Sequence, residues 1–203
     1  MKWARRNIHY ADSKSDMLLL AAAALALASV AATRGHLNRL LGLRIRASWL
    51  LLLAFAVQFL AMVVFPHADR ALLATMHIAS YGIGGFVVVA NRHVRGLPTI
   101  GFGGLLNAAA ITANGGTMPA SAQAMGMSGL TATFGSFENS AVLADPNVPF
   151  LGDIFAVPAS WPLSNVFSIG DVLIVVGAAV LLHFASGTRV ARARWIIGLC
   201  RWC

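Results

Sequence analysis

Charged residues are scarce in this sequence, and acidic residues are the scarcest. Of its 203 residues, 11% are charged and only seven are Asp or Glu. Ordinary soluble domains carry roughly 25% charged residues. Hydrophobic residues make up 58% of the chain, and its mean hydropathy is +0.74. This balance excludes an ordinary soluble domain and predicts an integral membrane protein.

Cysteine is almost absent as well. The two cysteines, Cys200 and Cys203, form a C-x-x-C at the C-terminal end. A zinc site needs two further ligands and a redox dithiol needs a folded domain around it, so no metal site is expected. Two interpretations of the pair stay open: palmitoylation of a juxtamembrane cysteine, or two thiols with no shared role. The sequence does not identify a cofactor.

Long apolar runs are present, and they determine the expected fold. A helix of about 17 to 25 apolar residues crosses the hydrocarbon core of a bilayer. Residues 97–113 are rich in Gly and Ala, which indicates a helix packed among the others. We therefore predict an all-α integral membrane fold with five transmembrane helices and a long extracytoplasmic cap loop between helices 4 and 5. The five predicted spans are 17–33, 48–65, 71–90, 97–113 and 166–186.

The remaining segments complete the expected organisation. Residues 1–16 form an N-terminal tail, residues 17–113 hold the first four helices, and residues 114–165 form the cap. The fifth helix, 166–186, is followed by a basic interfacial tail, 187–203, in which arginines alternate with Trp, Ile and Leu.

Basic residues are distributed unevenly between the two sets of loops. The connectors after the first and third spans and the C-terminal tail hold ten of the fifteen Lys and Arg residues, and all seven acidic residues fall on the other side. Because cytoplasmic loops carry the excess of positive charge, we expect the N-terminus outside and the C-terminus in the cytoplasm. The four basic residues of the N-terminal tail argue in the opposite direction.

The net charge of +8 does not indicate a nucleic-acid partner. Nucleic-acid binding needs a basic face on a folded domain, whereas these cations flank apolar spans, where anionic lipid headgroups attract them. The expected partners are the lipid bilayer and other membrane-protein subunits.

The cap segment, 114–165, contains no basic residue and five of the seven prolines. Its apolar residues argue against disorder, so we expect an ordered cap on the outer ends of the helices, with its aromatic anchors buried. The cap opens with Asn114, Gly115, Gly116 and Pro119. Asn or Gly in the left-handed conformation is expected to end the fourth helix, and Pro119 prevents it from resuming. The expected anchors are Phe134, Phe137, Phe150, Phe155, Trp161 and Phe167.

Four polar residues within the spans fall at a similar depth. At 1.5 Å per residue, His77 lies about 9 Å below the outer end of its span. Asn107, Gln58 and Asp171 are placed in the same layer. Intramembrane ionisable residues normally face the bundle interior, which makes each a candidate site residue. For Gln58 and Asn107, interhelical hydrogen bonds are the favoured interpretation.

Asp171 has two open interpretations. Ser168 stands three residues before it, the spacing of a capping box at a helix start, and this accounts for the acid without catalysis. A ligand-binding or catalytic role is the alternative. His183, at the inner end of the last span, is expected to snorkel to the interface.

Several motifs resemble those of a known family. The order of "HIASYGIGGF", "LLNAAAITANGGTMP", "FLGDIFAVP" and "VFSIGDVLIVV" is similar to an uncharacterised bacterial multi-span membrane family, domain of unknown function 5317. The resemblance extends over about residues 18–186. It implies a five-span bacterial protein of the cytoplasmic (inner) membrane and supplies no activity.

A fainter likeness connects the last span to lipoprotein signal peptidases, which are intramembrane aspartyl enzymes. That resemblance implies a catalytic role for Asp171. At the position of that family's second catalytic aspartate this sequence has Ala110, so only Asp153 is left as a second carboxylate. An aspartyl mechanism needs two acids that share one proton. Pro158 and Pro162 lie between the two acids, and the chain can double back there to bring them together.

Three functions therefore stay open. A structural or accessory subunit of a larger membrane assembly is favoured, because the chain is small and lacks a complete catalytic set. An intramembrane aspartyl-type hydrolase, acting at the outer leaflet through Asp171 and Asp153, is the alternative. A small transporter is the third, although no inverted repeat is visible and five spans divide badly into two.

Overall fold

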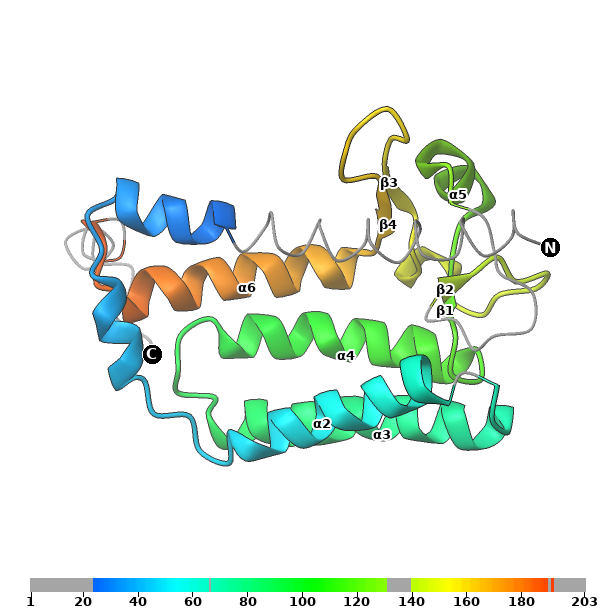
Figure 1. The fold of residues 1–203 in the computed structure, drawn as a ribbon, viewed down its shortest axis with the longest axis horizontal. Coiled ribbons are helices and arrows are strands. Elements are labelled where there is room, and N and C mark those ends of the chain that lie inside the picture. Colours follow the sequence, from blue (N-terminus) through cyan, green and yellow to red (C-terminus); the bar gives the residue numbers. More distant parts are fainter. Residues whose placement is uncertain (1–23, 66, 131–139, 190, 192–203) are drawn as a thin grey trace.

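The computed structural model describes residues 24–65, 67–130, 140–189 and 191 (Figure 1). Several sequence-based expectations fall outside these residues: the N-terminal tail, the start of the first span, and the cap residues Phe134 and Phe137. The Cys200 and Cys203 pair and nearly all of the interfacial tail also lie outside them.

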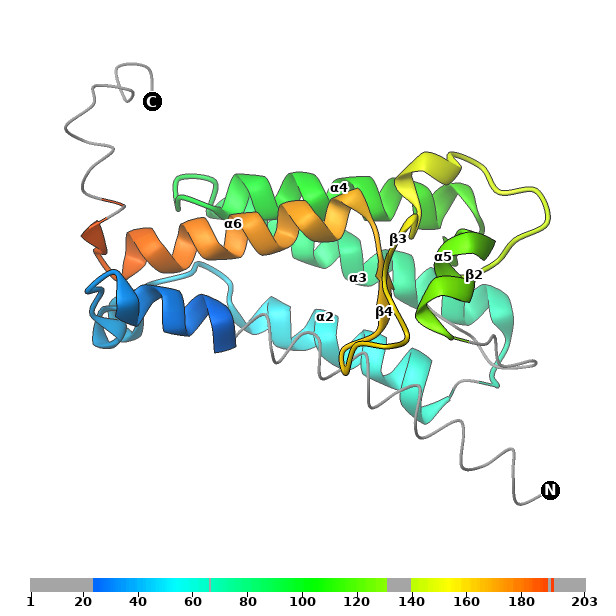
Figure 2. The same ribbon diagram turned by 90° about the horizontal axis from the view of Figure 1, so that it is seen from above.

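The described part of the chain is mostly helical, as predicted. Four longer helices run side by side along the long axis of the molecule (Figures 1 and 2). The bounds of these helices are α2 (Trp49–Phe59), α3 (Arg70–Ala90), α4 (Leu97–Ala113) and α6 (Ile169–Ala185). Residues 24–32 are also helical. A 3-10 helix, η1 (Leu37–Gly42), lies at one end of the bundle, and the cap lies at the other.

The predicted spans match these helices with two corrections. Among the described residues, only α3, with 21 residues, is long and apolar enough to cross a membrane by length and composition. α2 stops at Phe59 because the helix widens into a π-helix, η2 (Leu60–Val64). α6 begins at Ile169, later than predicted, because the residues before it form a strand. The structure therefore supports a helical fold. The lengths of the described helices do not support five spanning helices.

The closest helix packing joins α4 to α6, and glycines make it possible. A Cβ atom added to Gly103 would lie 2.4 Å from the Gly170 carbonyl oxygen, and one added to Gly177 would lie 2.7 Å from the Ile100 nitrogen. A Cβ atom added to Gly96, at the start of α4, would likewise lie 2.3 Å from the Gly177 carbonyl oxygen. Only residues without a side chain allow the two backbones to approach this closely.

Large apolar side chains point outward from the bundle. Leu52 and Phe55 on α2 are 73% and 69% exposed, and Leu105 on α4 is 62% exposed. Most of the buried positions of these helices hold small or polar residues, among them His77, Ser80, Gly103, Asn107 and Gly177, and three hold larger apolar ones, Leu73, Val87 and Ile111. This distribution is the reverse of that in an ordinary soluble protein.

The end opposite the cap is held together by hydrogen bonds from two polar residues. The side chain of Asn91, after α3, accepts from the Arg46 backbone N–H at 2.7 Å and donates to the Arg46 carbonyl at 2.9 Å. His183 on α6 lies 3.1 Å from the Ser29 hydroxyl and 3.1 Å from that of Thr188. His183 therefore joins two helical segments, and its expected position at the membrane interface stays a prediction.

The cap is built from short strands and helices. β1 (Met118–Pro119) pairs in parallel with β2 (Ser140–Ala141), and β3 (Phe155–Val157) pairs antiparallel with β4 (Asn165–Phe167). Between them lie α5 (Ala122–Ser128) and a 3-10 helix, η3 (Pro149–Leu151). The turn after α4 is followed directly by β1, so the cap begins where the helix leaves the bundle.

Three of the cap's described aromatic anchors are exposed, although all were predicted to be buried, and the fourth, Phe167, is half-buried. Phe150 is 65% exposed, Trp161 is 63% exposed, and Phe155 is 40% exposed. Backbone hydrogen bonds hold this region instead: Pro119 accepts from the Asp153 N–H at 2.9 Å, and Ala141 accepts from the Ala120 N–H at 2.8 Å. The expectation failed because main-chain pairing, and not aromatic burial, fixes the cap.

Candidate functional site beneath the cap

Asp171 stands in the first turn of α6, where the predicted capping box is present. The Ser168 hydroxyl accepts from the Asp171 N–H at 3.1 Å, and Asp171 Oδ2 accepts from the Ser168 N–H at 2.8 Å. This reciprocal pair satisfies donors that a helix start otherwise leaves without partners. The capping interpretation of the sequence is confirmed.

Asn107 supplies the partner that the other oxygen of Asp171 requires. Its Nδ2 donates to Asp171 Oδ1 at 2.8 Å, and its Oδ1 lies 2.9 Å from the Ser168 hydroxyl. A Cβ on Gly170 would lie 1.9 Å from Asn107 Oδ1, so the amide reaches the helix start only because residue 170 is glycine. We call Asn107, Ser168 and Asp171 the cap-end polar cluster.

Asp153 lies in the cap and is 5% exposed. Its backbone forms a bridge to Ala120, directly after β1, and its Oδ2 accepts a hydrogen bond from the Ser140 hydroxyl. No hydrogen bond from the described residues reaches its other oxygen, Oδ1. Burial raises the pKa of Asp153 from 3.8 to about 6; the Ser140 hydrogen bond opposes this rise, and the charge of Asp171 adds to it.

The two acids are close enough for the charge of Asp171 to act on Asp153, and the Tyr81 side chain packs against the buried cluster around Ile111 at the same end of the bundle. The Tyr81 ring also contacts His77, with 5.6 Å between ring centroids. The folded chain thus brings two carboxyl groups and a phenol to the cap end of the bundle, as the doubling back of the cap allowed.

The other two residues of the predicted polar layer lie elsewhere. His77, 1% exposed, has its Nδ1 2.9 Å from the Gly116 carbonyl oxygen, and because a carbonyl only accepts, Nδ1 carries the proton. Gln58 donates to the Ser80 hydroxyl at 2.7 Å and so joins α2 to α3. Similar depth did not produce one cluster, because helices at the same level present these side chains to different neighbours.

The exit from α4 has the geometry of a Schellman motif. The Gly116 N–H donates to the Ile111 carbonyl at 2.9 Å, and the Gly115 N–H donates to that of Thr112 at 3.3 Å. Gly115 and Gly116 have φ angles of 66° and 94°, in the left-handed region that favours glycine. Asn114 has φ −115°, so the glycines and not the asparagine adopt the predicted conformation.

Asn114 ties the end of α4 to the cap. Its Oδ1 accepts from the Asn147 N–H at 2.8 Å, and its Nδ2 donates to the Asn147 carbonyl at 2.9 Å. Asn147 in turn donates from its side chain to the Ala113 carbonyl at 2.9 Å. We call this reciprocal pair the asparagine clamp. Pro119 is the second residue of β1, and its carbonyl accepts from the Asp153 N–H.

Sequence reasoning missed three participants. Ser140 and Asn147 are distant in sequence from the residues they bond, and no spacing rule connects them. Tyr81 stands four residues after His77, so helical periodicity places both on one face, a signal that could have identified it. Among the described residues, no group of three His, Cys, Asp or Glu side chains can hold a metal ion.

Comparison with known proteins places the chain in a family. The description "Family of unknown function (DUF5317)" matches residues 42–183, more than half of the chain. The chain belongs to this family. The DUF5317 region includes the cap-end polar cluster, Asp153 and the asparagine clamp, and it excludes the helical residues 24–32. No curated protein and no solved structure matches the chain.

Proposed function

We propose that this DUF5317 chain is a small polytopic membrane protein that serves as a structural or accessory subunit of a larger assembly in the bacterial cytoplasmic membrane. The outward-facing large apolar side chains carry the proposal. Leu52, Phe55 and Leu105 would cost free energy in water but are favourable against lipid. Small and polar residues hold the helices together inside, as in membrane bundles.

The helix lengths are compatible with this proposal. At 1.5 Å per residue, the 17 residues of α4 and of α6 each extend about 26 Å. The hydrocarbon core is about 30 Å thick, and short helices are accommodated by thinning of the bilayer and by flanking residues. α2 and η2 continue one another from Trp49 to Val64. Five spans are therefore part of the proposal.

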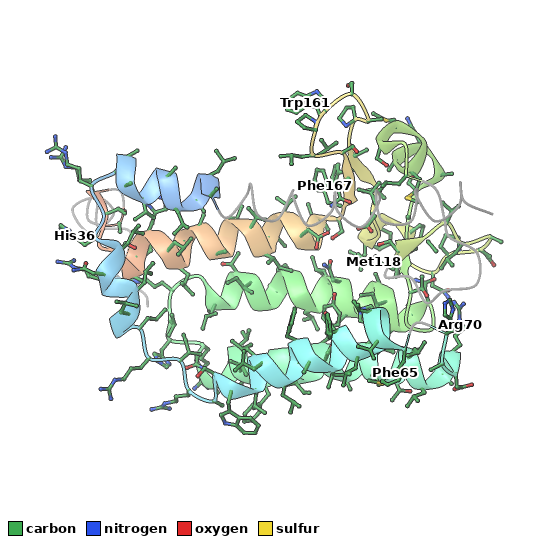
Figure 3. The ribbon with its side chains drawn as sticks, in the orientation of Figure 1. His36, Phe65, Arg70, Met118, Trp161 and Phe167 are labelled. Carbon is green, nitrogen blue, oxygen red and sulfur yellow. The ribbon has the colours of Figure 1, made fainter. Side chains whose placement is uncertain are left out.

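Charge separates the two ends of the bundle. All four acidic residues of the described chain, Asp69, Asp145, Asp153 and Asp171, lie at the cap end (Figure 1). Seven of the eight described arginines belong to the opposite end, and Arg70 lies at the cap end (Figure 3). Positive charge favours the cytoplasmic side, which supports N-outside, C-inside orientation.

The hydrogen bonding of Asp171 favours a structural role over catalysis. Both of its oxygens accept from Asn107 or Ser168. A carboxylate held in this way stabilises a helix start and a helix pair, and three donors from Asn107 and Ser168 already bond to its two oxygens. An accessory subunit needs such a rigid frame to present its surface to partners.

The test separates membrane insertion from assembly. Carbonate extraction of membranes should leave the chain in the pellet, and its release would contradict a membrane protein. Mild-detergent extracts of cells expressing a tagged chain at its natural level should yield a complex of fixed composition larger than one chain. A particle containing the single chain alone would contradict the accessory role.

A hydrolase acting at the outer leaflet is the second candidate, and Asp153 favours it. A buried carboxyl with its pKa raised to about 6, near a second acid, can hold the proton that an aspartyl mechanism needs. In this function Asp153 is the acid and Asp171 activates water after leaving its capping bonds. Loss of hydrolysis of a lipid or membrane-peptide substrate in both Asp153→Asn and Asp171→Asn, with folding retained, would support it. Retained activity in either variant would contradict it.

A further inference from the structure

The β3–β4 hairpin projects sideways from the cap end of the bundle. In Figures 1 and 2 it leaves the N-terminal end of α6 and lies, along the long axis, beside the C-terminal half of α4. Trp161 lies at its tip (Figure 3). The hairpin is therefore level with the last turns of the helices and not above them.

The hairpin is uncharged and apolar on its exposed surface. No residue between Asp153 and Asp171 carries a charge. Trp161 is 63% exposed, and Ile154 and Phe155 are 42% and 40% exposed. α6, which follows β4 directly in the chain, also has exposed apolar residues: Ile169, Val172, Val175 and Val176.

The hairpin is held firmly in this position. The Ala159 N–H, next to the tip, donates to the Met127 carbonyl of α5 at 2.9 Å. The rings of Phe155 and Phe167 stack across the two strands, with 5.4 Å between centroids. A turn closed by the Trp161 N–H and the Pro158 carbonyl, 3.0 Å apart, orders the tip.

We propose that the β3–β4 hairpin is a membrane-interface anchor, with Trp161 inserted at the level of the outer lipid headgroups. This inference rests on the membrane location given under the proposed function. Tryptophan is enriched at this depth, where its ring meets apolar chains and its N–H meets water. Continuity with the lipid-facing side of α6 identifies lipid, and not a soluble partner, as the occupant. The anchor fixes the cap, which contains Asp153, at the side of the bundle.

Spin-label accessibility tests the proposal in the full chain. Cys200 and Cys203 are replaced by Ser, and a nitroxide is attached at Trp161→Cys or, separately, at its exposed neighbour Ser160→Cys. The purified protein is placed in nanodiscs of zwitterionic and anionic lipid. Collision with oxygen, which concentrates in lipid, is compared with collision with a water-soluble nickel chelate. Matched labels at Phe55→Cys and Asp145→Cys mark the expected lipid-facing and aqueous positions.

The expected result is a depth parameter at residues 160 and 161 between those of the two reference labels, with oxygen favoured over nickel at 161. If both hairpin labels behave as residue 145 does while residue 55 reports lipid, the anchor is wrong and the membrane proposal stands. If residue 55 also reports water, the membrane location itself fails. Protection of the hairpin labels from both reagents indicates a contact with a second copy and overturns the lipid anchor.

Discussion

Two carboxyl groups lie at the cap end, and the regions that hold them differ. Asp171 belongs to the α4–α6 pair, where a capping box and an amide from the neighbouring helix satisfy both of its oxygens. Asp153 belongs to the cap, where strand pairing buries it with one side-chain donor, Ser140. The packing of α4 on α6 therefore supplies Asp171 with hydrogen-bond donors, whereas burial in the cap costs the charged form of Asp153 free energy and raises its pKa. The following predictions test this difference in order of expected effect.

The largest effect is expected where α4 meets α6. Gly170→Ala places a methyl group 1.9 Å from Asn107 Oδ1 and 2.7 Å from the Gly103 carbonyl oxygen. The two helices must separate, so we expect a loss of about 3 kcal/mol or more, at the upper end of overpacking effects. Thermal unfolding in detergent measures this loss.

Gly104→Ala is the matched control, because a Cβ there would have no atom within 4 Å. It should be neutral or stabilise by up to about 1 kcal/mol, since alanine is the better helix former. Equal stability of the two variants would show that close approach of α4 and α6 is not required.

Asp153→Asn tests the cost of burying the cap carboxyl. Its pKa is 3.8 ordinarily and about 6 in the fold, so below pH 3.8 the acid is protonated in both states. Stability falls as the pH rises from 3.8 to about 6, because the folded protein retains the proton longer. Above that range the asparagine variant should be more stable by up to about 3 kcal/mol.

The melting midpoint, measured at pH 4 and pH 7, checks this prediction. The wild type should lose stability between these values, and Asp153→Asn should lose less. Asp145→Asn, an exposed cap residue, is the control and should follow the wild type. A variant with the same pH dependence as the wild type would exclude Asp153 as the cause.

Asn107→Ala removes the interhelical donor to Asp171 Oδ1. Because a half-buried acceptor loses its interhelical donor while the capping box remains, we expect a loss of about 1 to 3 kcal/mol. Thr112→Ala, an exposed change on the same helix, should alter stability by less than about 0.5 kcal/mol. If the two variants unfold together, the Asn107 bond does not contribute.

The smallest effect is expected at the asparagine clamp. Asn114→Ala removes two hydrogen bonds to Asn147 from a partly exposed site, which corresponds to about 1 kcal/mol. Hydrogen exchange at the Asn147 amide should speed up about five-fold, because a loss of about 1 kcal/mol makes local opening of this part of the cap about five times more frequent. The control is Asn38→Ala on η1, at the opposite end. Unchanged exchange at residue 147 would show that strand pairing alone holds this part of the cap.

Local rules predicted the helices well. The bounds 97–113 were matched by α4, and 71–90 differed from α3 by one residue. Apolar run length and breakers determine these limits within the chain itself. The capping box was also readable, because Ser168 and Asp171 interact across three residues.

The cap was predicted only in outline. Its position at a helix exit followed from Gly115, Gly116 and Pro119, but aromatic residues were expected to be buried and Trp161 and Phe150 are exposed. Burial preference is a tendency of single residues, whereas backbone pairing between distant segments holds the cap without burying these rings. The pairing of β1 with β2 joins segments far apart in the chain, and no local pattern specifies it.

The sequence by itself determined the apolar helices, the glycine exit from α4, the capped start of α6 and the separation of basic from acidic ends. Each depends on residues within a few positions of one another or on composition. Tertiary structure alone decided that Asn107 bonds Asp171, that His77 bonds Gly116 instead, and that Ser140 and burial act on Asp153. The depth of a residue along a helix follows from its number in the sequence. The neighbour that its side chain meets depends on how the helix is rotated about its axis, and on which other helix can approach closely at glycine positions.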